Sequence, residues 1–231
     1  MNKAILSIQY PQFAARLHEL GYEIIPTDTI PCEMTYEQDH ADLQCLILDN
    51  TAFVLKHCQR LSEALSGRYQ VIRCGEHFNG SYPDNVCLSA VKLADQLICR
   101  VSSLDHKVKE YCRKHRYELI NVNQGYAKCS CAQVCENAII TADNSIINAL
   151  NDKKPEVLPI GKGSIRLNGA EYGFIGGASG YDSKTHTLYF CGDISRHPDY
   201  DNIKLFCKKN NTQIVSLSND ELTDIGGIIL C

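Results

Sequence analysis

One structural pattern occurs four times along the chain, and its regular spacing constrains the fold more than any other feature. Each copy predicts a strand, a short turn, a second strand, a helix and a third strand. The copies begin at Leu43, Val86, Lys128 and Tyr172, which lie 43, 42 and 44 residues apart. Their predicted elements span residues 43–48, 52–55, 57–65 and 69–73; 86–91, 96–100, 104–114 and 117–122; 128–134, 138–141, 145–150 and 156–160; and 172–178, 187–191, 202–208 and 213–217. A fixed period of this length is typical of a repeat array or a propeller.

The two ends of the chain together predict a fifth copy. Residues 4–8 are apolar, residues 11–20 have a helical pattern and residues 23–26 are typical of a strand, which is a unit without its first strand. Residues 225–230 form a lone apolar segment that contains Gly226-Gly227. If this last strand pairs with the first, the unit is complete and the closed ring leaves no open sheet edge. We therefore expect an α/β propeller that forms a single domain over residues 1–231.

The composition argues against several classes of protein. Lysine and arginine number 23 against 27 aspartate and glutamate residues, a net charge of −4, so no nucleic-acid partner is expected. Apolar runs are shorter than the ~18 residues that a membrane helix needs, and residues 1–8 become polar too soon for a secretory signal. No nucleotide-binding glycine motif occurs, and no cofactor is predicted. The expected protein is cytoplasmic, and nothing in the sequence indicates its oligomeric state.

The thirteen cysteines are predicted to be reduced and mostly buried. Their odd number and the missing secretory signal argue against a disulfide framework, and free cysteine packs as a small apolar residue. One cluster differs, because strand alternation would put Cys129, Cys131 and Cys135 on a single face. Three thiols on one face suit zinc or an iron–sulfur cluster. No C-x-x-C pair or fourth ligand accompanies them, so metal binding is an alternative here rather than the main prediction.

Five such units closed through the chain ends resemble the pentein fold. That fold is shared by arginine deiminases, dimethylarginine dimethylaminohydrolases, agmatine deiminases, amidinotransferases and the non-enzymatic translation initiation factor six. Three segments also resemble a family of uncharacterised bacterial proteins: Gln124-Gly-Tyr-Ala-Lys128-Cys129-Ser130, Ala138-Ile-Ile-Thr141-Ala-Asp143 and Asp224-Ile-Gly226-Gly227. The resemblance implies a five-bladed α/β propeller over nearly the whole chain.

In the enzymes of this fold, a cysteine nucleophile lies on the closing strand, a histidine acts as acid and base, and carboxylates hold the guanidinium. In agmatine-deiminase-like sequences a Gly-Gly pair is followed by three residues and then that cysteine, and Gly226-Gly227-Ile-Ile-Leu-Cys231 has the same spacing. The resemblance therefore makes Cys231 the candidate nucleophile. The H-x-D motif expected at the start of the fourth unit is missing from Tyr172-Gly-Phe-Ile, and it occurs instead as His40-Ala-Asp42 in the first unit.

Polar residues at the starts of the units predict a binding pocket. His40, Asp42, Asp84, Lys128 and Asp224 lie at or just before the first strand of their units. A ring of inward-pointing strands would bring these positions to one mouth of a central channel, where mixed charge suits a zwitterionic or cationic ligand. Strand alternation favours Lys128 as the residue that faces the ligand and Cys129 as a core residue.

Three hypotheses follow for function. The first is a central polar pocket that binds a small polar ligand, guanidino- or amino-acid-like, with cysteine chemistry on an amidino group if the protein is an enzyme. The second is a non-catalytic interaction module of the same fold. The third is a metal protein built on the cysteine cluster.

Overall fold

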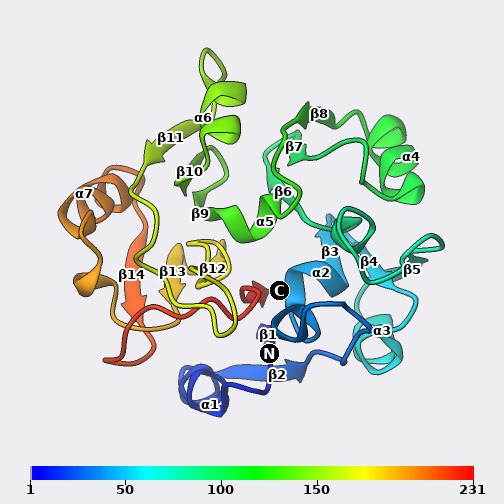
Figure 1. Ribbon diagram of the computed structural model, residues 1–231, viewed down its shortest axis with the longest axis horizontal. Helices are drawn as coiled ribbons and strands as arrows, with labels where there is room; N and C mark the ends of the chain where they lie inside the picture. The colour runs from blue at the N-terminus through cyan, green and yellow to red at the C-terminus, as the bar shows by residue number, and fades with distance from the viewer. Residues whose placement is uncertain (1) are drawn as a thin grey trace.

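The structure, a computed structural model, describes residues 2–231 as five three-stranded sheets arranged in a ring (Figure 1). In each sheet the central strand pairs antiparallel with one neighbour and parallel with the other. A helix connects the two parallel strands, as a parallel crossover requires. The ring of strand–strand–helix–strand units predicted from the sequence is therefore confirmed.

Four units are continuous in sequence and the fifth joins the two ends of the chain. The four continuous units comprise β3 (Cys45–Leu48), β4 (Thr51–Leu55), α3 (Gln59–Ser66) and β5 (Gln70–Cys74); β6 (Ala90–Leu93), β7 (Gln96–Cys99), α4 (His106–His115) and β8 (Glu118–Asn121); β9 (Cys131–Cys135), β10 (Ala138–Thr141), α6 (Asn144–Leu150) and β11 (Glu156–Pro159); and β12 (Ser179–Asp182), β13 (Thr187–Phe190), α7 (Tyr200–Lys209) and β14 (Gln213–Ser216). The fifth comprises β15 (Ile229–Leu230), β1 (Asn2–Leu6), α1 (Pro11–Glu19) and β2 (Tyr22–Pro26).

The closing unit forms as the sequence predicts. Ala4 pairs with Leu230 and Ile5 with Ile229 in an antiparallel ladder. The backbone of Lys3 adds two hydrogen bonds to Cys231, with N···O distances of 2.7 and 2.9 Å. Both marked ends of the chain accordingly lie together near the centre of the ring (Figure 1).

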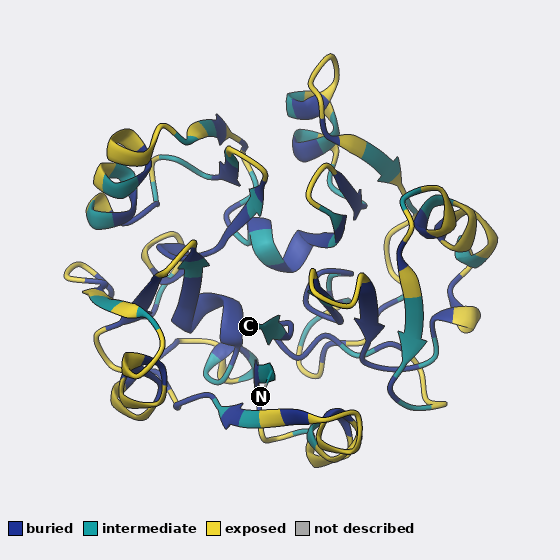
Figure 2. Ribbon diagram, turned by 180° about the vertical axis from the view of Figure 1, so that it is seen from behind, coloured by how far each residue is buried: buried dark blue, intermediate teal, exposed yellow. Residues whose placement is uncertain are grey.

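Every unit buries its helix in the same way. Each helix places two buried apolar residues four positions apart, on one face, against its own sheet. The pairs are Phe13 and Leu17, Leu61 and Leu65, Val108 and Cys112, Ile146 and Leu150, and Ile203 and Cys207. The exposed residues therefore concentrate on the outer helices and loops, while the inner strands are buried (Figure 2).

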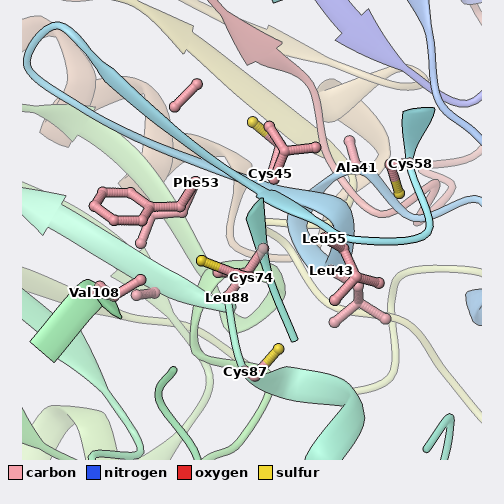
Figure 3. Packing of buried hydrophobic residues seen from close by; sticks show 14 of the residues in the cluster. Ala41, Leu43, Cys45, Phe53, Leu55, Cys58, Cys74, Cys87, Leu88 and Val108 are labelled. Carbon is pink, nitrogen blue, oxygen red and sulfur yellow. The ribbon is translucent and has the colours of Figure 1, made fainter. Parts of the chain in front are cut away.

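The core is rich in cysteine. Phe53, Leu55 and Leu43 pack in the largest cluster together with Cys45, Cys58, Cys74 and Cys87 (Figure 3). All thirteen cysteines are free of disulfides and eleven of them are buried, which confirms their predicted role as core residues. Among the described residues, no helix is long and apolar enough to cross a membrane.

The strands that open the units differ from the prediction. In the first and third units a short helix, α2 (Ala41–Gln44) or α5 (Ala127–Ser130), takes the place of the first predicted strand residues. The 3-10 helix η2 (Asp84–Val86) does the same in the second unit, and in the fourth the strand begins only at Ser179. The remaining 3-10 helices are η1 (Thr35–Glu37) and η3 (Ile194–Arg196). These turns reverse the chain at the channel, and they supply the side chains of the site.

Candidate active site

The turns that precede the first strands meet around one mouth of the ring. They are joined by a closed circle of five hydrogen bonds, each of which links one unit to the next. The donors and acceptors are Asp42 N to Gly226 O, Gly227 N to Gly177 O, Gly177 N to Cys129 O, Lys128 N to Ser89 Oγ, and Ser89 Oγ to Asp42 Oδ2. Because the circle passes through all five units, it fixes the turns relative to one another.

Four ionisable side chains from three of these turns lie together and are almost inaccessible to solvent. His40 is the residue before α2 and Asp42 lies within it, Cys129 lies on α5, and Asp224 lies in the turn before β15. Their exposed fractions are 4%, 1%, 2% and 0%. Burial of several ionisable side chains costs free energy unless they are paired with one another. A group of this kind therefore indicates a functional site rather than part of the hydrophobic core.

The distances within this group suit cooperation between a thiol and an imidazole. A ring nitrogen of His40, Cys129 Sγ and a carboxylate oxygen of Asp224 all lie within 4.8 Å of one another. Cys129 Sγ is 4.0 Å from Asp224 Oδ1, and His40 Nδ1 is 4.0 Å from Asp42 Oδ1. At these separations the thiol, the imidazole and the carboxylate are close enough to act on one small group in a cavity beside them.

Backbone contacts hold Asp224 and His40 in place. Asp224 accepts hydrogen bonds from the N–H groups of Phe174 and Gly226, each at 2.9 Å. A Cβ at Gly226, which has φ of +76°, would collide with His40, so only glycine fits this position. The Gly226-Gly227 pair thus allows the turn before β15 to pass close to His40.

The electrostatics of the site favour a positively charged ligand. Burial raises the pKa of both Asp42 and Asp224, and the charge of Asp224 adds to the shift at Asp42, while His40 and Lys128 oppose the shift at both. The pKa of Cys129 is held well above its ordinary value, first by burial and then by Asp224 and Asp42. An added cation would lower all three pKa values, because it stabilises the charged forms.

A cavity of about 320 Å³ opens directly over this group. His40, Cys129 and Asp224 line it together with the rings of Tyr36, Tyr126, Tyr172 and Phe174. Tyr126 and Phe174 stack with ring centroids 6.4 Å apart, and Tyr172 meets Phe174 edge-on at 6.3 Å. The volume lies at the lower end of the range for small-molecule pockets, about 300–1,000 Å³.

A buried carboxylate completes one wall of this cavity. Glu37 is 6% exposed and accepts hydrogen bonds from Tyr126 Oη at 2.8 Å and from Asn85 Nδ2 at 2.7 Å. Asn85 itself is buried and belongs to the second unit, which therefore supports the wall from outside the cavity through Glu37. These hydrogen bonds fix the ring of Tyr126 in the cavity lining, and they hold the Glu37 carboxylate at the cavity surface.

The structure brings together only some of the residues that the sequence proposed. His40, Asp42 and Asp224 converge as expected. Asp84 does not: it is exposed, is held by Asn79 Nδ2 at 2.8 Å, and lines a different cavity. The prediction missed by one residue, because η2 turns Asn85 rather than Asp84 toward the wall.

Lys128 and Cys129 exchange the roles that the sequence predicted. Lys128 lines a second cavity of about 230 Å³, together with Lys92, Tyr181 and Ile229, whereas Cys129 lines the cavity with His40. The prediction was wrong because residues 127–130 form a helical turn, in which successive side chains do not alternate between opposite faces.

The two other cysteine predictions also fail on geometry. Cys231 does not line the cavity; it ends the closing segment, and its half-buried thiol lies beside Tyr69. The predicted cluster of Cys129, Cys131 and Cys135 does not form either. Cys131 packs with Val91 and Ile139, and Cys135 lies 3.6 Å from Asn210 Oδ1 in another core cluster.

Sequence reasoning missed Cys129, Glu37 and Tyr126 as parts of the site. Cys129 shares its place at the start of a unit with His40 and Asp224, and that position was the available signal. Glu37 and Tyr126 lie in segments between units, where no periodic pattern marks them.

Comparisons with known proteins agree with this architecture. The model of a Family of unknown function (DUF6873) matches residues 5–229. No curated protein matches the chain. Solved structures do resemble it, at low sequence identity, and they show its fold.

Three of these structures cover most of the chain. A dimethylarginine dimethylaminohydrolase adduct with 4-chloro-2-hydroxymethylpyridine has a TM-score of 0.59 at 11% identity, over 95% of this chain and 93% of that one. A cysteine-to-serine mutant of the same kind of enzyme from Pseudomonas aeruginosa, complexed with citrulline, has a TM-score of 0.55 at 10% identity, over 90% and 80%. SxtG, an amidinotransferase from Microseira wollei in the saxitoxin biosynthetic pathway, has a TM-score of 0.54 at 9% identity, over 94% and 82%. The expected pentein fold is confirmed.

Proposed function

We propose, on the premise that this chain belongs to the Family of unknown function (DUF6873) and has the pentein fold, that it binds a small organic cation over Cys129 and acts on it by thiol chemistry. The observation that carries the proposal is the group at the cavity floor. Two carboxyl groups and a thiol are buried there with a single imidazole, beneath a wall of aromatic rings.

A cation is the ligand that this environment stabilises most. Positive charge next to Asp224 replaces the lost hydration of its carboxylate, and the faces of the tyrosine and phenylalanine rings attract cations by about 0.5–2 kcal/mol each. A planar amidinium or guanidinium group stacks on aromatic faces and also offers several N–H donors to carboxylates. Two of the structural neighbours suit this choice, since one holds citrulline and another is an amidinotransferase.

The cation also activates the nucleophile. In the free protein the raised pKa of Cys129 keeps the thiol protonated at neutral pH. A bound amidinium offsets the negative field of Asp42 and Asp224, which lowers the pKa of Cys129 and favours transfer of its proton to His40. The reactive thiolate then forms only when the ligand is in place.

The reaction that follows is attack on the amidino carbon. The sulfur of Cys129 bonds to that carbon, the bond from carbon to the departing amine breaks, and His40 returns its proton to the amine. Water then adds to the same carbon and the S–C bond breaks, which restores the thiol. Asp224 holds the cationic group in the line of attack throughout.

A charged electrophile tests the proposal. At neutral pH, 2-chloroacetamidine should alkylate Cys129 faster than uncharged 2-chloroacetamide does, and mass spectrometry of peptides should place the label on that residue. Cys129→Ser should abolish the fast labelling, whereas Cys131→Ser, a matched change at a buried cysteine outside the cavity, should retain it. Equal rates for the two reagents, or a label confined to Cys231 and Cys135, would contradict both the cation site and its nucleophile.

A further inference from the structure

The cavity lining is one-sided in charge. Asp224 lies at its floor, Glu37 in its wall and Glu171 at its exposed rim, and the described residues that line it include no lysine or arginine. Among the described residues, His40 is the one histidine in the lining. An acidic lining without a basic residue is unusual for a pocket that must hold an amino acid, because the ligand carboxylate then has no charged partner.

The nearest basic residues are engaged elsewhere. Arg166 bonds Glu221 at 3.1 Å and Asn168 at 2.9 Å. Lys128 faces the second cavity, and Lys162 lines a separate cavity that shares Tyr172 and Phe174 with this one. None of the three lines the cavity over Cys129.

A second observation marks the cavity floor as built for positive charge. Asp42 Oδ1 is buried, lies 4.0 Å from His40 Nδ1 and has no hydrogen-bond partner within residues 2–231, and Asp42 adds its field to that of Asp224 on Cys129. The carboxyl group of Asp42 thus adds acidic character beneath the cavity, although His40 and Lys128 partly offset its field. The floor and the rim therefore each present acidic charge to a ligand that spans them.

We infer that the ligand is a dication without a carboxylate, a guanidine or amidine joined by a short chain to a second amine. The inference rests on the proposed function and narrows its ligand class. The guanidinium end contacts Asp224 beside Cys129, the chain lies along the aromatic wall, and the second cation meets Glu171, which forms no ion pair within the described chain.

An amino acid of the same length is excluded by its carboxylate. That group would reach the rim beside Glu171, with Glu37 in the wall below it. Like charges brought together in a partly desolvated cavity repel strongly, and no lining cation is present to offset them. Discrimination therefore comes from repulsion of the wrong ligand as much as from attraction of the right one.

Three probes that differ by one group at a time test the inference. Agmatine carries two cations, butylguanidine lacks the second amine, and arginine adds a carboxylate to agmatine. The binding affinities can be measured by calorimetric titration of Cys129→Ala protein, which cannot turn the ligands over. Agmatine should bind most tightly, butylguanidine less tightly and arginine most weakly, with arginine at least roughly tenfold weaker than agmatine. Glu171→Gln should reduce agmatine to the affinity of butylguanidine and leave butylguanidine unchanged, whereas Glu136→Gln, at an exposed glutamate outside the cavity, should change neither.

The outcomes separate this inference from the function on which it rests. Arginine binding as tightly as agmatine would overturn the inference while the cation site stood. An unchanged agmatine affinity in Glu171→Gln would remove the second subsite. If none of the three guanidines binds and 2-chloroacetamidine does not label Cys129, the proposed function itself fails.

Discussion

Replacing Asp42 by asparagine should stabilise the protein. The side chain is 1% exposed. Within residues 2–231 its Oδ1 has no hydrogen-bond partner, and its Oδ2 accepts a hydrogen bond from Ser89 Oγ at 3.4 Å. Asparagine keeps the shape and the Ser89 contact but removes the charge. Burial of an unpaired polar group costs about 1–3 kcal/mol and costs more when the group is charged, so loss of the charge should raise the free energy of unfolding by about that amount at neutral pH. For a chain of this size each kcal/mol corresponds to about 2–4 °C in Tm.

The gain should depend on pH in a defined direction. Burial, and then the neighbouring Asp224, raise the pKa of Asp42 in the folded protein, against His40, Cys129 and Lys128, which face it and lower it. The folded state therefore binds the proton more tightly than the unfolded chain, and the contribution of Asp42 to stability falls as the pH rises through the folded pKa. The advantage of Asp42→Asn should be smallest at and below the ordinary pKa of 3.8 and should grow as the pH rises above it toward alkaline solution.

Urea denaturation followed by circular dichroism across this pH range measures the difference directly. Asp84→Asn, at an exposed aspartate, is the matched control and should stay within about 0.5 kcal/mol of the parent at every pH. An Asp42→Asn protein that is less stable at high pH, or whose advantage does not vary with pH, would refute the reasoning. The stabilised variant should also show a smaller preference for 2-chloroacetamidine, because it lacks the part of the negative field that comes from Asp42.

Three further predictions concern reactivity and packing. Labelling of Cys129 by uncharged 2-chloroacetamide, followed in a stopped-flow assay, should be slow near neutral pH and increase only in alkaline solution, since the pKa of this thiol is raised well above its ordinary value. A disulfide reagent should titrate few thiols in native protein, beginning with half-buried Cys135 and Cys231, and all thirteen after denaturation. Phe53→Ala should lower the free energy of unfolding by about 3–5 kcal/mol, and a loss under 1 kcal/mol in chemical denaturation would contradict the packing of the largest cluster.

The order of elements was predictable because each unit carries a local signal. Buried pairs such as Leu61 and Leu65 recur at helical spacing in every unit, and the central strands are apolar on both faces. Closure was predictable from composition, since the apolar segment ending at Leu230 needed a partner and residues 2–6 lacked one.

The details of the site were not predictable for a physical reason. A four-residue helix such as α5 is too short to form by its own propensity, and its place is set by contacts with other units. One such turn moves Cys129 from the predicted core to the cavity. A 3-10 turn likewise directs Asn85 toward the site in place of the predicted Asp84. The spacing of Cys231 from the Gly-Gly pair carries no information on which unit supplies the nucleophile.

The pairing of Ala4 with Leu230 also sets an order of assembly during synthesis. Four sheets draw their strands from continuous stretches, so each can form as soon as its own stretch has left the ribosome. The sheet that contains β1 cannot, because β15 is translated last among the elements. Throughout translation the nascent chain therefore carries β1 with an open edge, a site for pairing with other chains. Its final segment decides when that vulnerability ends and when the circle of turns around Cys129 can close.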